Sequence, residues 1–237
     1  MIIGTGALHA ELTDAFVQKQ ERVVTTFYSE GRRESLKPAA PGKARIGKGP
    51  REPKTENPAA GAGDAFFSLP WNPGSSLGSR NLILQTEQRL GGIDQAFLIF
   101  PSGKFSEPFH QLTIAAVEKT LDYRVKSYLL LLRDLLNYFM DKKSGSLFGI
   151  LHFEEGERAS PLVAGAYEMF RTAFLSCLSI YQGESFNLIG FESSSADLSG
   201  YRDLIVKSSG GGTKPGLTMN VFPPRGLFSR AGRRRPD

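Results

Sequence analysis

The single thiol in this sequence is a candidate nucleophile. Cys177 lies among Phe174, Leu175 and Leu178, in a stretch with the apolar spacing of a helix. Cysteine in such a setting is usually buried, whereas reactive thiols occupy electropositive, partly exposed places. We therefore expect Cys177 to be a buried structural residue. One cysteine also excludes a disulfide within the chain.

Lysine and arginine form the next candidate group, because they could bind the phosphates of a nucleic acid. The chain has 29 Lys and Arg against 24 Asp and Glu, a formal charge of +5. Much of this excess lies in residues 37–54 and in Arg233-Arg234-Arg235, where aromatic residues for base stacking are absent. We expect solvated charges here and no nucleic-acid interface. No apolar run of about 18 residues and no secretion signal is found, so we predict no membrane span and a cytoplasmic protein.

Short apolar runs alternate with longer stretches of helical periodicity along most of the chain. Ile93–Phe100 is largely apolar, as expected for a parallel strand buried on both faces. The alternation predicts an α/β fold with a Rossmann-like, doubly wound, mostly parallel seven-stranded sheet and helices on both faces. Strands are expected near residues 1–3, 22–27, 65–69, 93–100, 146–152, 186–191 and 217–221. Helices are expected near residues 8–16, 77–90, 113–140 (or from Glu107), 161–181 and 196–206.

One domain over residues 1–224 is the expected organisation, because 40% hydrophobic residues suffice for a core of ordinary size. Residues 31–64 interrupt it with Pro, Gly, Ala, Lys and Arg, and their large apolar residues are Leu36 and Ile46. Such a segment cannot bury enough surface to offset its ordering entropy, so we predict a long mobile loop. Residues 225–237 are predicted to be a basic disordered tail.

The segment from Leu90 to Phe191 resembles the short-chain dehydrogenase/reductase (SDR) family in spacing and in local motifs. Leu90-Gly91-Gly92-Ile93-Asp94 is similar to the family's GGIDVLVNNAG segment, and Phe109-His110-Gln111-Leu112-Thr113 to its FHELT helix start. Residues 120–127 are similar to VLDVNLKG, residues 144–147 to GSGSIVNISS, and residues 167–171 to the YxxxK helix. The resemblance implies a Rossmann fold whose usual functional residues are largely replaced.

Four catalytic positions follow from this resemblance. In the family a Tyr exchanges the proton at the substrate oxygen, a Ser holds that oxygen, a Lys lowers the Tyr pKa, and an Asn holds a relay water. The equivalent residues here are Tyr167, His152 (within one residue), Arg171 and Arg124. Arg171 could favour a tyrosinate but could not pass a proton onward. His152 could act as an acid near neutral pH, or it could be a remnant at a strand end.

The cofactor positions implied by the resemblance are altered as well. Gly4 and Gly6 supply two early glycines, followed by larger residues where the family keeps further glycines for the pyrophosphate. Asn72 takes the adenine position, and Pro101-Ser102-Gly103 replaces the family's Asn-Ala-Gly, so Ser102 and Gly103 are candidate contacts. Arg32 and Arg33 could bind the 2′-phosphate of NADP or remain solvated loop charges. The Pro-Gly beside the nicotinamide is replaced near Glu192-Ser193.

Two functions compete on these residues. Simultaneous loss of several positions predicts a degenerate SDR-like protein with little or no oxidoreductase activity and a scaffold or protein-binding role. The alternative is a divergent NADP(H)-dependent oxidoreductase acting on a carbonyl or alcohol substrate through Tyr167, with NADP or NAD as cofactor. No metal site is expected. The helices near 113–140 and 161–181 are apolar on more than one face, and the family uses them as a four-helix interface, so we predict a homodimer or homotetramer.

Overall fold

The structure is a computed structural model that describes residues 1–27, 66–75, 77–101, 108–153, 160–212 and 216–223. The loop predicted over 31–64 and the tail predicted over 225–237 lie outside these ranges. The predicted cofactor contacts Arg32, Arg33, Ser102 and Gly103 lie outside them too.

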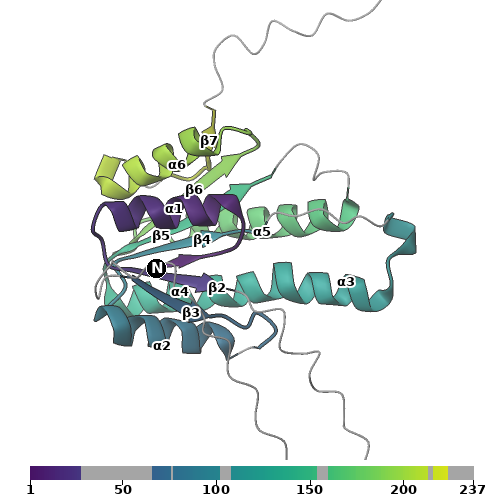
Figure 1. Cartoon of the computed structure of the whole chain (residues 1–237), viewed down its shortest axis with the longest axis horizontal. Coiled ribbons are helices and arrows are strands. Elements are labelled where there is room, and N and C mark those ends of the chain that lie inside the picture. The colour runs from purple at the N-terminus through teal and green to yellow at the C-terminus, as the bar shows by residue number, and fades with distance from the viewer. Residues whose placement is uncertain (28–65, 76, 102–107, 154–159, 213–215, 224–237) are drawn as a thin grey trace, which may run out of the picture.

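Seven strands form one sheet in the order β3-β2-β1-β4-β5-β6-β7 (Figure 1). All neighbouring pairs are parallel. The strand order reverses between β1 and β4, which is the switch point of a doubly wound sheet. This arrangement confirms the predicted α/β fold. The strands are β1 (Ile2–Ile3), β2 (Val23–Phe27), β3 (Phe66–Pro70), β4 (Gln95–Ile99), β5 (Ser146–His152), β6 (Asn187–Ser193) and β7 (Asn220–Phe222).

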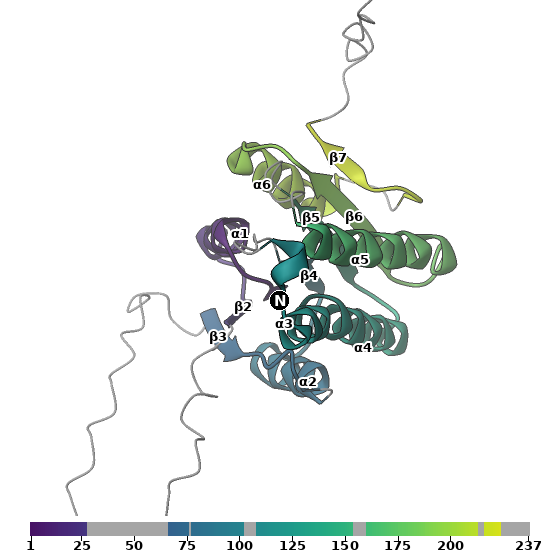
Figure 2. The ribbon, with the colours of Figure 1, turned by 90° about the vertical axis from the view of Figure 1, so that its right-hand side faces the viewer.

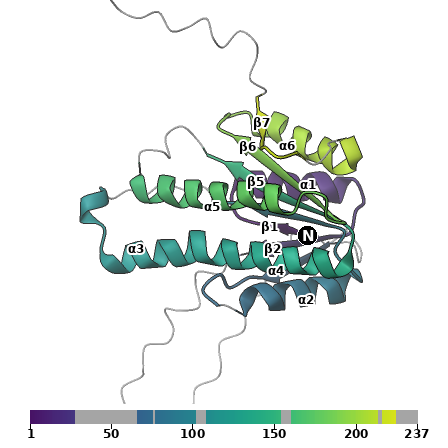
Figure 3. The same ribbon diagram turned by 180° about the vertical axis from the view of Figure 1, so that it is seen from behind.

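Helices cover both faces of the sheet (Figures 2 and 3). One face carries α1 (Ala7–Gln18) and α6 (Leu198–Lys207), and the other carries α2 (Gly78–Leu90), α4 (Ser127–Lys142) and α5 (Pro161–Ile180). Each face has its own apolar core. Cys177, predicted to be buried, is half-buried against the core on the α2, α4 and α5 face. Burial raises the pKa of its thiol. Within the described ranges, no helix has the length and apolar character needed to cross a membrane.

The long helix predicted before Met140 is interrupted by a wider turn. Thr113 caps its start, where the hydroxyl accepts a hydrogen bond from the Ala116 amide at 3.2 Å. The helix continues as α3 (Ile114–Thr120), the π-helical segment η3 (Leu121–Lys126) and α4. A short 3₁₀ turn, η2 (Phe109–Gln111), precedes it, and a second π-helical segment, η5 (Ser208–Gly212), follows α6. Apolar periodicity did not distinguish η3 from the α-helices on either side of it.

Glycines in β5 and β6 allow α5 to pack closely on the sheet. A Cβ added at Gly149 would lie 2.3 Å from the Phe174 ring, and one added at Gly190 would lie 3.3 Å from it. Phe174 is fully buried. Because Phe174 and Tyr167 are two helical turns apart on α5, this close packing also fixes where Tyr167 lies relative to β6.

Candidate functional site

Two of the four predicted catalytic residues meet at a third residue, Glu192. Tyr167 and Arg171 lie one turn apart on α5, and Glu192 projects from the carboxyl end of β6. The Tyr167 hydroxyl donates a hydrogen bond to Glu192 Oε1 at 3.0 Å. Arg171 Nε donates to Oε1 at 3.1 Å and to Oε2 at 3.0 Å. The carboxylate therefore binds both the phenol and the guanidinium.

The environment of Tyr167 keeps its proton on the phenol. Its side chain is buried against the rings of Phe153 and Phe100, with ring centroids 4.6 and 6.1 Å away. Burial raises the pKa of Tyr167, and the charge of Glu192 and the hydrogen bond to it raise that pKa further. Arg171 opposes them more weakly. A tyrosinate is thus disfavoured, whereas acid–base catalysis by a tyrosine needs a pKa nearer the working pH.

His152 faces away from Tyr167. It lies on the α1 and α6 side of the sheet, near the Tyr201 ring at a centroid distance of 6.0 Å. Its Nε2 donates to the Ser195 carbonyl oxygen at 2.9 Å and so holds the backbone that follows β6. Successive side chains of a strand alternate between faces, so the next residue, Phe153, contacts Tyr167. In the family a serine hydroxyl is expected beside the tyrosine. Here the phenyl ring of Phe153 lies beside Tyr167 instead.

Arg124 also interacts with backbone. It lies in η3, and its Nη1 donates to the carbonyl oxygen of Pro101 at 2.9 Å. Pro101 lies two residues after the end of β4 at Ile99, so this contact ties the helix to the carboxyl edge of the sheet. The structure therefore brings Tyr167 and Arg171 together at Glu192, whereas His152 and Arg124 each donate to a main-chain carbonyl elsewhere.

The loop between β1 and α1 contains Gly4 and Gly6, the two glycines predicted as cofactor contacts. Gly6 caps α1 with φ 93°, and no side chain accepts a hydrogen bond from the first turn. Gly4 is required for packing, because a Cβ there would lie 2.7 Å from Ile99 Cβ. Its amide donates to Thr26 Oγ1 at 3.3 Å. The exposed start of a helix this long attracts anions through its free amides.

His9 occupies the first turn of α1, where a dinucleotide-binding loop would keep a glycine. Its Nε2 lies 2.8 Å from Thr25 Oγ1 on β2. Burial lowers the pKa of His9, and a hydrogen bond with the Ile2 carbonyl opposes that shift. A neutral His9 therefore links α1 to β2, and this linkage replaces the close helix–strand approach that glycine would give.

Asn72, the predicted adenine contact, takes part in a local hydrogen bond. Asn72 Oδ1 accepts a hydrogen bond from the Gly74 amide at 3.0 Å, which stabilises the turn after β3. The preceding residue, Trp71, is buried and packs edge-on against Tyr128 at a centroid distance of 5.2 Å. Among the described residues, neither Trp71 Nε1 nor the Tyr128 hydroxyl has a hydrogen-bond partner.

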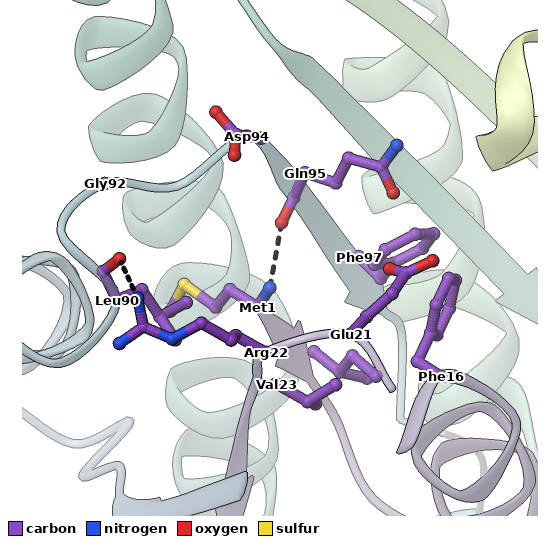
Figure 4. A pocket seen from close by; sticks show the side chains of 11 residues that line it. Met1, Phe16, Glu21, Arg22, Val23, Leu90, Gly92, Asp94, Gln95 and Phe97 are labelled. Carbon is purple, nitrogen blue, oxygen red and sulfur yellow. Dashed lines mark hydrogen bonds between the residues drawn. The ribbon is translucent and has the colours of Figure 1, made fainter. Parts of the chain in front are cut away.

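A pocket of about 540 Å³ lies at the opposite edge of the sheet, where β1, β2 and β4 begin (Figure 4). A second hollow of about 640 Å³ adjoins it and shares Leu90, Gly92 and Asp94. Sequence reasoning missed this pocket because it followed motifs at the carboxyl edge. It missed the role of Glu192 too, although an acid near the carboxyl end of a strand beside the tyrosine helix was a usable signal.

Comparison with known proteins gives the same fold. No protein-family model matches the chain, and no curated protein sequence matches it. Among solved structures, serine dehydrogenase from Escherichia coli is similar with a TM-score of 0.63 and 14% identity, over 93% of this chain and 95% of that one. A metagenomic short-chain oxidoreductase in complex with NADP has a TM-score of 0.65 and 14% identity, over 88% of each chain.

A third similar structure is 3-ketoacyl-(acyl-carrier-protein) reductase from Brucella melitensis complexed with NADH. Its TM-score is 0.59 and its identity 12%, over 85% of this chain and 81% of that one. Identities this low establish a common architecture. The chain has the fold of the short-chain dehydrogenases/reductases, as its motifs between Leu90 and Phe191 predicted.

Proposed function

We propose that this chain is an SDR-like scaffold with little or no oxidoreductase activity. The observation that carries the proposal is the contact of Tyr167 with Glu192, because the phenol at the family's tyrosine position donates its hydrogen bond to a carboxylate and keeps its proton. Phe153 offers no hydroxyl beside that phenol, and Arg124 is directed at a backbone carbonyl. Among the described residues, the phenol and Arg124 are therefore engaged in other hydrogen bonds, and the side chain that packs on the phenol carries no hydroxyl.

The residues present fit only one half of a nicotinamide dinucleotide. The start of α1 at Gly6, with no acid in its first turn, fits a pyrophosphate. The other half does not fit, because Glu192 places a carboxylate where Tyr167 and Arg171 would otherwise meet substrate and ribose. We therefore derive no hydride transfer for this chain.

Catalytic assay of the full chain tests the proposal. With NADP⁺ or NAD⁺ and L-serine, or with NADPH or NADH and a 3-ketoacyl thioester, we expect no turnover above the buffer rate. Tyr167→Phe should give the same result as the natural chain. A working tyrosine acid contributes about 10²–10⁴-fold to rate, so a loss of that size in Tyr167→Phe would contradict the proposal. Calorimetric titration with each cofactor accompanies the assay.

The alternative is a divergent NADP(H)-dependent oxidoreductase acting through Tyr167. Its support is that Tyr167 and Arg171 keep the one-turn spacing of the family's pair, and that one similar structure contains NADP. This function requires Glu192 to release the phenol when cofactor binds. Tight NADPH binding together with turnover that depends on Tyr167 would establish this alternative in place of the scaffold.

We also propose that two copies of the chain associate through α5 and the continuous helix of α3 and α4, which lie side by side on one face (Figure 3). Ile114 on α3 and Met169 on α5 are exposed by 80% and 50%. Gly165, Thr172 and Ser176 keep the outer face of α5 shallow, so another helix could approach closely. Exposed apolar side chains beside such a face favour a self-complementary interface.

Light scattering after size exclusion should give a mass of at least twice the chain mass of 25.9 kDa. The double variant Ile114→Glu, Met169→Glu should shift that mass to the monomer, because charges would be buried in the interface. Leu84→Glu on α2, which is exposed by 54%, is the matched control and should leave the mass unchanged. A monomeric natural chain at every concentration would overturn the proposal.

A further inference from the structure

Two hydrogen-bond donors on α5 form a fork that the helix builds by itself. Tyr167 and Arg171 lie one turn apart, so their side chains project from the same face of α5. Phe170, which lies between them in the sequence, is fully buried and stacks on Phe100 at a centroid distance of 5.0 Å. This packing fixes the place of the two donors on the sheet, so their position does not require Glu192.

One carboxylate fills this fork. Both oxygens of Glu192 accept from Arg171 Nε, at 3.1 and 3.0 Å, and Oε1 also accepts from the Tyr167 hydroxyl at 3.0 Å. Proteins commonly recognise carboxylate groups through charge-assisted hydrogen bonds of this kind, with a guanidinium as the principal donor. The fork is therefore complementary to a carboxylate, whichever molecule carries it.

Glu192 reaches the fork from a separate element. It belongs to β6 and pairs with Val221 of the edge strand β7, so it lies one strand from the end of the sheet. Its side chain is 18% exposed and that of Arg171 is 32% exposed, so water reaches both. The donors and their acceptor are thus held by different parts of the fold, and a free carboxylate can approach the donors once Glu192 is out of the fork.

The charge balance keeps other acids out while Glu192 is in place. Among the described residues, Arg171 lies between two acids, because Glu168 Oε2 is 3.9 Å from its Nη1. One guanidinium beside two carboxylates has no excess positive charge to attract a third. A free acid must displace Glu192, which the fold holds beside the donors at a very high effective concentration.

We propose that Tyr167 and Arg171 form a binding site for a small carboxylate ion, and that Glu192 is the internal ligand that keeps this site closed. The inference rests on the proposed function, since it assigns the Tyr167 phenol to binding in place of catalysis. The size of the ligand follows from Glu192, whose atoms beyond the β-carbon are a CH₂–COO⁻ fragment. A compact monocarboxylate the size of acetate is therefore the ligand class.

Urea unfolding of full-length Glu192→Ala near neutral pH tests the inference, because this variant lacks an acetate-sized fragment. We compare sodium acetate with sodium chloride at the same concentration, about 100 mM, and expect acetate to raise the ratio of folded to unfolded protein about tenfold, as for a Kd of about 10 mM. Acetamide has the same shape without the charge, so it should raise the ratio less than about twofold. Ligand-observed NMR with acetate accompanies the unfolding curves.

Further variants assign the effect to the fork. Adding Arg171→Met to Glu192→Ala should abolish it, since methionine carries no donor. Adding Tyr167→Phe instead should lower the affinity for acetate about fivefold, as the loss of one hydrogen bond implies. Glu168→Ala is the matched control, because it removes the other acid beside Arg171 and leaves Glu192 in the fork. Acetate should change its unfolding, and that of the natural chain, less than about twofold.

An effect of acetate on Glu192→Ala no larger than that of chloride or acetamide would overturn the inference, and so would an equal effect on the natural chain. If Glu192→Ala is unfolded in chloride, its recovery in acetate supports the site. Failure of acetate to recover this variant and to stabilise Glu192→Ser counts against it. None of these measurements involves turnover, so their result is separate from that of the catalytic assay of Tyr167→Phe.

Discussion

Replacing Phe174 with alanine should lower the free energy of unfolding by about 3–5 kcal/mol, the usual cost of removing a fully buried phenylalanine. Phe174 has no exposed surface, and its ring fills the space above Gly149 and Gly190. Those glycines cannot move into the cavity, because they are held in the middle of β5 and β6 by the parallel ladder. The cavity left by alanine would therefore remain largely unfilled.

Urea titration of the full chain measures this loss, with Phe174→Leu as the matched variant. Leucine keeps the site apolar and fills most of the volume, so it should cost clearly less than alanine, about 1–2 kcal/mol. Equal losses for the two variants, or a loss under about 1 kcal/mol for alanine, would show that α5 does not depend on this contact. The denaturant slope should stay constant across the series.

The alternation of strands and helices was predictable because buried parallel strands are apolar throughout. The runs predicted at 93–100 and 146–152 became β4 (Gln95–Ile99) and β5 (Ser146–His152). The final strand was less accurate, predicted at 217–221 and found at Asn220–Phe222. It is an edge strand with one neighbour, and Leu217 is 51% exposed, so hydrophobicity did not mark which residues pair.

The candidate site was predictable only where its geometry is local. Tyr167 and Arg171 are four residues apart on one helix, so spacing alone places them together. Glu192 is 25 residues from Tyr167, and its contact depends on how α5 lies across β6. Strand periodicity carries part of that information, because Leu188, Gly190 and Glu192 share one face of β6 and Phe191 lies on the other.

The same periodicity explains why His152 does not face Tyr167. A shift of one residue along a strand moves a side chain to the opposite face of the sheet. Leu147 and Leu151 lie in the core beneath α5, whereas Phe148 and Ile150 lie in the core beneath α1 and α6. His152 lies on the same face of β5 as Phe148 and Ile150. A motif alignment that is uncertain by one residue therefore cannot decide which side of a sheet a catalytic residue occupies.

Glu192→Ala should lower the free energy of unfolding by about 2 kcal/mol, because it leaves the buried Tyr167 hydroxyl without an acceptor. Arg171 contributes little to this loss, since its side chain is 32% exposed and water can replace the carboxylate. Tyr167→Phe alone should cost only about 1 kcal/mol, because Glu192 keeps its hydrogen bonds to Arg171.

The double variant separates this contact from general damage. Once Tyr167 is phenylalanine, no phenol remains to be stranded, so Glu192→Ala should then cost about 1 kcal/mol less than in the natural chain. Glu168→Ala, an exposed acid 3.9 Å from Arg171 Nη1, is the control and should leave stability nearly unchanged. If removing Glu192 costs the same with and without the Tyr167 hydroxyl, the carboxylate does not hold that phenol, and the argument that Tyr167 is withdrawn from chemistry fails with it.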